Sequence, residues 1–270
     1  MHLFIKAVLL GIIEGITEFL PISSTGHLII ANRFIEFTGN FANLFDVVIQ
    51  LGAILSVVVY FWHRLNPFSG VKTAEEKQHT WLLWKKSLAG VLPALLIGGA
   101  IGHKVEELLF DPMVVACALI VGGVVLWWLE SSQRTVSVTA VEQMSYRTAL
   151  AIGLIQCLAM VPGTSRSAAT IIGAMMLGLS RPAAAEFSFF LAIPTMAAAS
   201  AYSLLKAQLQ LTTMEWQTLA IGFVVSFFVA WLVIAFFMNY IRNNNFKPFA
   251  VYRIILAIVL FLLLFKGILL

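Results

Sequence analysis

Long apolar segments recur along the whole chain and are separated by short polar connections. A helix needs about 20 apolar residues to cross the hydrocarbon core of a bilayer. Six segments approach or reach that length, at residues 44–63, 87–103, 113–130, 185–205, 216–239 and 249–269. The pattern therefore predicts an all-α, polytopic membrane protein with six transmembrane helices.

Two further apolar regions are each interrupted by a short run of proline, glycine and hydroxyl residues. They comprise residues 3–20 and 27–37 around Pro21–Gly26, and residues 148–161 and 168–179 around Pro162–Ser167. Proline lacks the amide donor that a helix needs, whereas a hydroxyl residue can cap the helix that follows. Irregular backbone at membrane depth is tolerated only inside protein or along a wet cavity. We therefore expect two re-entrant helix-turn-helix pairs.

The first and second halves of the chain resemble each other. Pro21–Thr25 aligns with Pro162–Arg166 after a one-residue gap, and Asp46 then aligns with Glu186 near the start of the next span. Each half contains one interrupted pair and three spans, and an odd number of spans makes the second copy enter the membrane from the opposite side. We predict one membrane domain over residues 1–270, with a first repeat at 1–132 and a second repeat of opposite topology at 145–270.

Composition and cysteine usage exclude several classes of protein. Of the 270 residues, 60% are hydrophobic and 11% are charged, against about 45–50% and about 25% in an average soluble domain. The net charge of +4 is spread over the connecting loops, which argues against a nucleic-acid partner. Cys117 and Cys157 each lie alone in an apolar segment, so we expect neither a disulfide nor a metal site from them.

The lysines and arginines predict the orientation in the membrane. One side collects Lys6, Arg33, Lys104, Lys206 and Lys266, and the other collects Arg64, Lys72, Lys77, Lys85, Lys86, Arg134, Arg147, Arg181, Arg242, Lys247 and Arg253. Cytoplasmic loops carry the excess of basic residues. The larger set is therefore expected in the cytoplasm and both termini outside, with Arg166 in the second interrupted turn and in neither set.

Glu14 and Glu18 are four residues apart in the first short helix, which places both carboxylates on one face of an otherwise apolar segment. An ionised group at the centre of a bilayer is costly, so this pair needs a cation, a proton or a wet cavity. A divalent cation that links both carboxylates to phosphate oxygens would meet that need, as is typical of Mg²⁺. The alternative is a carboxylate pair satisfied by hydroxyl groups, by Arg166 or by surface water.

Each interrupted turn leads into the N-terminus of a helix, where free backbone amides and the helix dipole favour an anion such as phosphate. The candidate binding residues are Ser23, Ser24, Thr25 and Gly26 in the first turn, and Gly163, Thr164, Ser165 and Ser167 in the second. Ordinary helix capping without a ligand is the alternative. Two such turns that face each other favour a shared anion site.

His27 and Arg166 complete the set of candidate residues. Neutral imidazole accepts a proton near physiological pH, so His27 is a candidate base, nucleophile or metal ligand. The planar guanidinium of Arg166 suits two phosphate oxygens at once. The alternatives are a histidine satisfied by a nearby hydroxyl or carbonyl, and an arginine in a salt bridge that only joins the two repeats. Gln50, Gln156, Asp46 and Glu186 either line the same cavity or serve helix–helix contacts.

Two stretches resemble the signature motifs of the bacitracin-resistance type undecaprenyl-diphosphatases. They are Glu14-Gly-Ile-Thr-Glu-Phe-Leu-Pro-Ile-Ser-Ser-Thr-Gly-His27 and Pro162-Gly-Thr-Ser-Arg-Ser-Ala-Ala-Thr170, and the resemblance runs the full chain. The family often has glycine where this chain has Ala168. The resemblance implies a multi-pass enzyme of the bacterial inner membrane that hydrolyses undecaprenyl diphosphate to the monophosphate and orthophosphate. It further implies recycling of the carrier for peptidoglycan synthesis and bacitracin resistance.

The resemblance also implies roles for particular residues, a divalent cation (Mg²⁺ or Ca²⁺) and a site that opens toward the outer face. The acidic pair is Glu14 and Glu18, the candidate nucleophile is Ser24, and the essential histidine and arginine are His27 and Arg166. The chemistry stays open at this point. Either Ser24 attacks with His27 or Glu18 as base, or His27 activates water. A flippase or transporter of an isoprenyl phosphate is the alternative function, membrane lipid is the surrounding partner, and a homodimer is compatible with the sequence.

Overall fold

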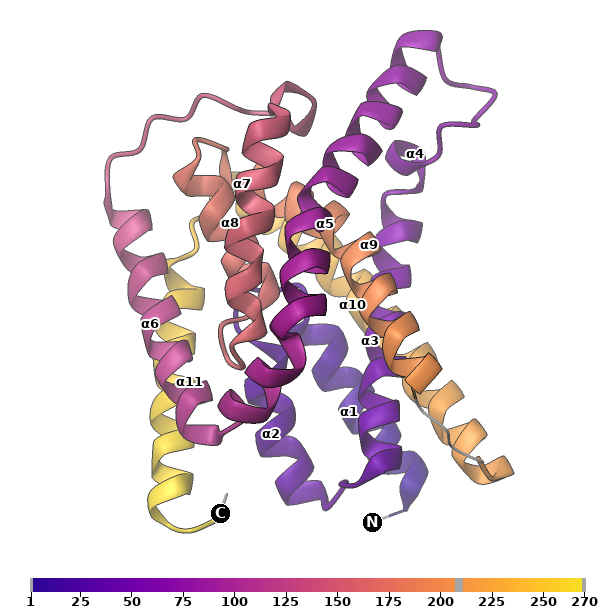
Figure 1. Ribbon diagram of the computed structural model, residues 1–270, viewed down its shortest axis with the longest axis vertical. Coiled ribbons are helices and arrows are strands. Elements are labelled where there is room, and N and C mark those ends of the chain that lie inside the picture. The colour runs from indigo at the N-terminus through magenta and orange to yellow at the C-terminus, as the bar shows by residue number, and fades with distance from the viewer. Residues whose placement is uncertain (1, 207–210, 269–270) are drawn as a thin grey trace.

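The computed structural model describes residues 2–206 and 211–268, and helices account for almost all of the regular structure in this part of the chain (Figure 1). The helices are α1 (Leu3–Thr17), α2 (Ser24–Ile35), α3 (Asn40–Tyr60), α4 (Trp62–Leu65), α5 (Ala74–Leu109), α6 (Pro112–Ser131), η1 (Val141–Gln143), α7 (Tyr146–Gln156), η2 (Cys157–Met160), α8 (Arg166–Met176), α9 (Arg181–Lys206), α10 (Thr213–Asn243) and α11 (Lys247–Phe265).

Six of these helices, α3, α5, α6, α9, α10 and α11, are long and apolar enough to cross a membrane. Helices α5, α6, α9 and α10 each contain a predicted span in full. The other two predicted spans run past their helices, because α3 ends at Tyr60 rather than at residue 63 and α11 ends at Phe265. The predicted end at residue 269 lies outside the described residues. The all-helical, six-span fold class is therefore confirmed. The largest difference is α5, which begins at Ala74 because the polar stretch from Glu75 to Gln78 continues the helix beyond the apolar run.

The two interrupted regions form the helix pairs α1–α2 and α7–α8, and the two pairs open toward opposite ends of the molecule (Figure 1). Their boundaries differ from the prediction. Ser24 and Arg166 are each the first residue of a helix, whereas the sequence placed both in the preceding turns. The reason is that Ser23 and Ser165 are the capping residues, and each helix begins at the residue directly after its cap. Both helices therefore begin earlier than the predicted residues 27 and 168.

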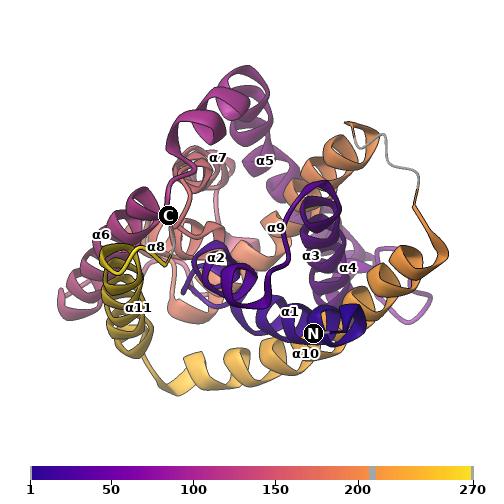
Figure 2. The same cartoon turned by 90° about the horizontal axis from the view of Figure 1, so that it is seen from below.

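Pairs of helices from the two halves of the chain pack against each other. Helix α1 packs on α10 and α7 on α5, while α6 pairs with α11 and α3 with α9. Small residues permit close contacts of this kind, because a Cβ atom on Gly15 would lie 2.9 Å from the carbonyl oxygen of Ser226. Figure 2 shows the short helix α2 near the centre of the molecule, with the longer helices around it. The start of α1 and the end of α11 lie at the same end of the molecule (Figure 1).

Candidate functional site

The two turns before α2 and α8 have the same unusual backbone. Ser23 and Ser165 have φ values of 72° and 70°, in the left-handed region that residues other than glycine rarely adopt. Each serine hydroxyl caps its helix by accepting a hydrogen bond from the amide three residues later, that of Gly26 at 3.3 Å and that of Ala168 at 3.2 Å. Strained backbone of this kind concentrates at functional sites. The shared geometry presents the first residue of each helix, Ser24 and Arg166, in the same way.

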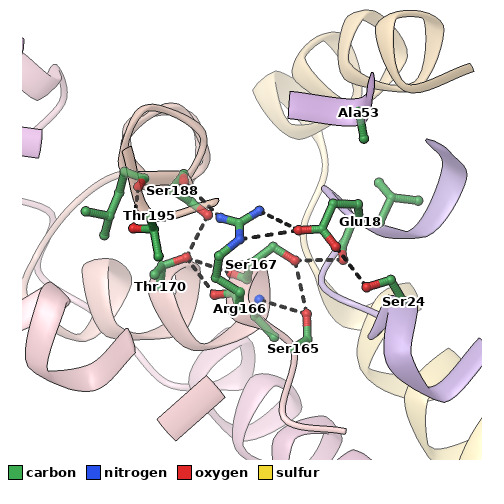
Figure 3. Close-up of polar contacts among 12 residues, drawn as sticks. Glu18, Ser24, Ala53, Ser165, Arg166, Ser167, Thr170, Ser188 and Thr195 are labelled. Atoms are coloured by element: carbon green, nitrogen blue, oxygen red, sulfur yellow. Dashed lines mark hydrogen bonds and ion pairs between the residues drawn. The ribbon is translucent and has the colours of Figure 1, made fainter. Parts of the chain in front are cut away.

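Glu18 joins these two residues. Its Oε2 accepts a hydrogen bond from the Ser24 hydroxyl at 2.8 Å, and its Oε1 lies 3.1 Å from Nη2 of Arg166. Figure 3 shows the guanidinium pointing at the carboxylate from one side and Ser24 from the other. The Arg166 and Glu18 side chains are only 12% and 9% exposed. The predicted meeting of the two interrupted turns is thus present in the structure.

Further contacts hold Arg166 and the second turn in place (Figure 3). Nη1 of Arg166 donates to the carbonyl of Ser188 at 3.1 Å, and its guanidinium lies 5.9 Å from the ring centre of Phe19. The hydroxyl of Ser167 donates to the carbonyl of Leu20 at 2.9 Å, which ties α8 to the first turn. These contacts hold Arg166 beside Glu18.

Glycine is required in the second turn. Gly163 has φ 89°, and a Cβ atom there would lie 2.5 Å from the carbonyl oxygen of Val115. Thr25, the second residue of α2, and Thr164, in the second turn, are half-buried, and Gly26 is buried. The predicted binding residues therefore all lie in the two turns or in the first helical turn after them.

Glu14 lies in α1 one helical turn before Glu18. It is fully buried, and neither carboxylate oxygen has a hydrogen-bond partner among the described residues. Glu18, Asp46 and Arg166 are its electrostatic neighbours. A buried carboxylate in this state needs a proton or a cation. The described residues contain no group of three or more histidine, cysteine, aspartate or glutamate side chains that could hold a metal, so a cation here would take two carboxylates plus oxygens from water or substrate.

His27 is oriented away from the Ser24–Glu18 pair. Its Nδ1 lies 2.7 Å from the carbonyl oxygen of Ser23, and its Nε2 lies 2.7 Å from the hydroxyl of Tyr252 in α11. Both ring nitrogens are therefore occupied by groups other than Ser24. The predicted use of His27 as a base for Ser24 would require the ring to turn.

Arg253 belongs to the site, although the charge pattern of the sequence predicted it among the loop cations. It is fully buried in α11. Its guanidinium donates to the carbonyls of Pro21 at 3.3 Å, Gly163 at 3.2 Å and Thr164 at 3.0 Å, and to those of Ala118 and Leu119 at 3.3 and 3.4 Å. It thereby binds both turns. The sequence did contain a signal for this burial, because Arg253 lies about two helical turns inside an apolar segment.

The weaker candidates divide between the site and other parts of the molecule. Asp46 lies beside Asn32 and near Glu14. Gln156 lies 3.4 Å from the hydroxyl of Thr195. Glu186 instead pairs with Arg64, which also contacts Glu142. Burial lowers the pKa of Arg64, but the two glutamates outweigh that effect and raise its pKa above the usual value. Glu186 therefore belongs to an ion-pair network.

Together the fold and the site define a multi-pass integral membrane protein in which an arginine, a carboxylate and a serine meet between two helix N-termini. The family model described as "Bacitracin resistance protein BacA" matches residues 7–259. The chain belongs to this family.

Curated relatives agree over almost the full length. The chain is 51% identical over 256 residues to Undecaprenyl-diphosphatase 1 of Clostridioides difficile (strain 630), covering 94% of this chain and 93% of the relative. It is 49% identical over 266 residues to the Undecaprenyl-diphosphatase of Fusobacterium nucleatum subsp. nucleatum, covering 96% and 99%. It is also 49% identical over 261 residues to the Undecaprenyl-diphosphatase of Lactobacillus delbrueckii subsp. bulgaricus, covering 94% and 95%.

Proposed function

We propose that this chain hydrolyses undecaprenyl diphosphate to undecaprenyl phosphate and orthophosphate, and so recycles the lipid carrier for peptidoglycan synthesis. Full-length relatives bear the name undecaprenyl-diphosphatase. The observation that carries the proposal is the convergence of Arg166 and Ser24 on Glu18. An anion-binding group, a hydroxyl nucleophile and a proton acceptor are the parts that phosphoryl transfer requires.

In the proposed complex Arg166 binds the diphosphate. Its planar fork provides two parallel donors for phosphate oxygens, and it already lies at the start of α8 with its guanidinium beside the start of α2. The amides and hydroxyls of the two turns supply further donors, and the helix dipoles favour the negative charge. The isoprenoid tail lies between helices in the bilayer.

Ser24 is the proposed nucleophile and Glu18 its base. The Ser24 hydroxyl already donates to Oε2 of Glu18 at 2.8 Å, within the range required for proton transfer. As Oγ bonds to the terminal phosphorus, the proton passes to Glu18 and the P–O bond to undecaprenyl phosphate breaks. Water then hydrolyses the phosphoserine, and its phosphorus–oxygen bond to Ser24 breaks to release orthophosphate.

A divalent cation, Mg²⁺ or Ca²⁺, is part of the proposal. Glu14 fits this role because both of its oxygens are buried and lack a hydrogen-bond partner among the described residues. With Glu18 it would hold the ion, which when bound neutralises charge on the phosphate oxygens.

The inverted repeat and the orientation also belong to the proposal. The matching caps at Ser23 and Ser165 support a duplication, as does the exchanged packing of α1 on α10 and α7 on α5. We propose that α1–α2 and α7–α8 are re-entrant pairs of the repeats at 1–132 and 145–270. Basic residues concentrate at the end opposite the termini, which supports termini outside. We further propose that the site opens to the outer face of a bacterial inner membrane, as the resemblance to the family implies.

Phosphate release from undecaprenyl diphosphate by purified protein in detergent tests the function. We expect release that depends on a divalent cation, a loss of at least 100-fold for Arg166→Ala, and near wild-type rates for the exposed Arg242→Ala. Detergent removes the second compartment, so a flippase without hydrolysis would release nothing and would contradict the proposal. Rapid quench with labelled substrate should trap phosphate on Ser24, and its absence from a fully active preparation would remove the covalent step.

A further inference from the structure

His27 and Tyr252 form a pair that the proposed reaction does not use. The His27 Nε2 lies 2.7 Å from the Tyr252 hydroxyl, and the two rings stack with centroids 5.5 Å apart and an interplanar angle of 9°. On its other side the imidazole lies 2.7 Å from the carbonyl oxygen of Ser23. The pair therefore connects α11 to the capping residue of α2.

The hydrogen bonds define where the imidazole proton lies. A carbonyl oxygen only accepts, so Nδ1 must carry a hydrogen to bond to Ser23. In the neutral ring Nε2 is then an acceptor, and the Tyr252 hydroxyl is the donor that it faces. Each partner thus favours the same tautomer.

The carbonyl that His27 contacts belongs to a strained residue. Ser23 has φ 72° and directly precedes Ser24, the proposed nucleophile. A left-handed serine persists only when surrounding contacts fix it. Tyr252 is itself firmly placed, because the next residue, Arg253, is fully buried and bonds to the carbonyls of both turns.

We propose that Tyr252 is a positioning residue: its hydroxyl holds the imidazole of His27 in the Nδ1–H form, so that the ring fixes the Ser23 carbonyl and orients Ser24 toward Glu18. The role of Ser24 rests on the proposed function, but the tautomer does not. In this role Tyr252 touches neither the substrate nor the reacting atoms and acts only through His27.

Nitrogen-15 NMR of protein labelled at histidine reads the tautomer directly. The chain has five histidines, and a spectrum of His27→Asn identifies the His27 signals by their loss. At about pH 8.5, well above the pKa of about 6.5 for an ordinary histidine, we expect the wild-type proton on Nδ1. Tyr252→Phe should move it at least partly to Nε2. The matched control is Tyr240→Phe. The Tyr240 hydroxyl contacts the Asn245 carbonyl near the C-terminal end of α10, so this variant should leave the spectrum unchanged.

Phosphate release provides the second readout. We expect Tyr252→Phe to lower kcat roughly 3- to 10-fold, the effect of one ordinary hydrogen bond, with KM within about twofold because the anion-binding groups are untouched. Asparagine places its amide near Nδ1 and glutamine near Nε2, so His27→Asn should retain more activity than His27→Gln. In the His27→Asn background the Tyr252→Phe change should have no further effect, since it acts through the imidazole.

Three results would overturn the proposal. They are a wild-type proton on Nε2, a tautomer that Tyr252→Phe does not alter, and a Tyr252→Phe loss that persists unchanged in the His27→Asn background. Melting curves of each variant separate these outcomes from misfolding. If the wild type released no phosphate at all, the proposed function would fail while the NMR result still decided the tautomer.

Discussion

Single residues carry most of the chemistry, and the two buried arginines do so in different ways. Arg166 faces a carboxylate, whereas Arg253 is surrounded by backbone carbonyls from both turns. Arg253 is fully buried, so an incoming anion cannot reach it. Arg166 is partly exposed and paired with a carboxylate, so it is able to exchange that partner for an anion. We infer a fixed arginine that shapes the site and an exchangeable one that binds the diphosphate.

Replacement of Arg253 should therefore destabilise the fold as well as the reaction. Arg253→Leu removes a charged donor from several buried carbonyls, and we expect a loss of about 2–4 kcal/mol. Thermal unfolding in detergent measures this loss. Arg242→Leu is the control because Arg242 is exposed at the end of α10. Equal melting curves for the two variants would contradict the role of Arg253 in holding the two turns together.

Glu14 should control the response to divalent cations. Glu14→Gln keeps the shape of the side chain but removes the charge that a metal requires, so we expect at least a tenfold higher Mg²⁺ concentration for half-maximal phosphate release. The exposed Glu75→Gln is the control. Metal titrations of both variants check this, and an unchanged Mg²⁺ requirement in Glu14→Gln would exclude Glu14 as a ligand.

At the scale of helices, the close contact between α1 and α10 positions the acidic pair. A Cβ atom on Gly15 would lie 2.9 Å from the Ser226 carbonyl oxygen and 2.8 Å from Cβ of Val229. These atoms are backbone or near it, so α1 must move away if Gly15 is enlarged. Because Glu14 directly precedes Gly15 and Glu18 is the C-cap residue of the same helix, such a movement would also separate them from Arg166.

Gly15→Ala should accordingly lower both stability and activity. We expect a stability loss of about 1–3 kcal/mol, as for other overpacked sites. Gly99 of α5 is the matched control, since a Cβ atom there would contact nothing within 4 Å, and Gly99→Ala should stabilise the helix by about 0.5–1 kcal/mol. Melting curves with opposite shifts support the contact, and parallel shifts would refute it.

Helix positions were predictable from sequence, but helix boundaries and partners were not. Apolar length located all six spans, and the proline-containing turns located both interrupted pairs. The start of α2 at Ser24 depends on the left-handed backbone of Ser23, which tertiary contacts impose. Likewise, the polar start of α5 and the burial of Arg253 follow from packing that apolar length does not record.

At the scale of the whole molecule, the two halves of the chain depend on each other. The Glu18–Arg166 ion pair, the Ser167–Leu20 hydrogen bond and the Arg253 contacts all join the first turn to the second. Neither half alone contains a complete site. The candidate residues were identifiable because they are polar in apolar surroundings, whereas the role of Tyr252 required coordinates, since aromatic residues near the end of a span are common.

The orientation can be tested on intact cells. In a protein without Cys117 and Cys157, we expect Thr38→Cys, in the connection between α2 and α3, to react with an impermeant maleimide added outside. Ser69→Cys lies in the connection between α4 and α5 at the other end of the molecule. It should react only after lysis, as the excess of basic residues at that end predicts. The reverse pattern would invert the proposed topology.

The carboxylate that Ser24 and Arg166 share has a consequence for which anions the site accepts. Glu18 already pairs with the guanidinium of Arg166 at 3.1 Å, and this ion pair compensates a cation that would otherwise lie unpaired inside the membrane. An incoming anion must displace the Glu18 carboxylate from Arg166. A diphosphate has more charge and more oxygens than a carboxylate, so we expect it to displace Glu18 more readily than a membrane lipid with a single negative charge does.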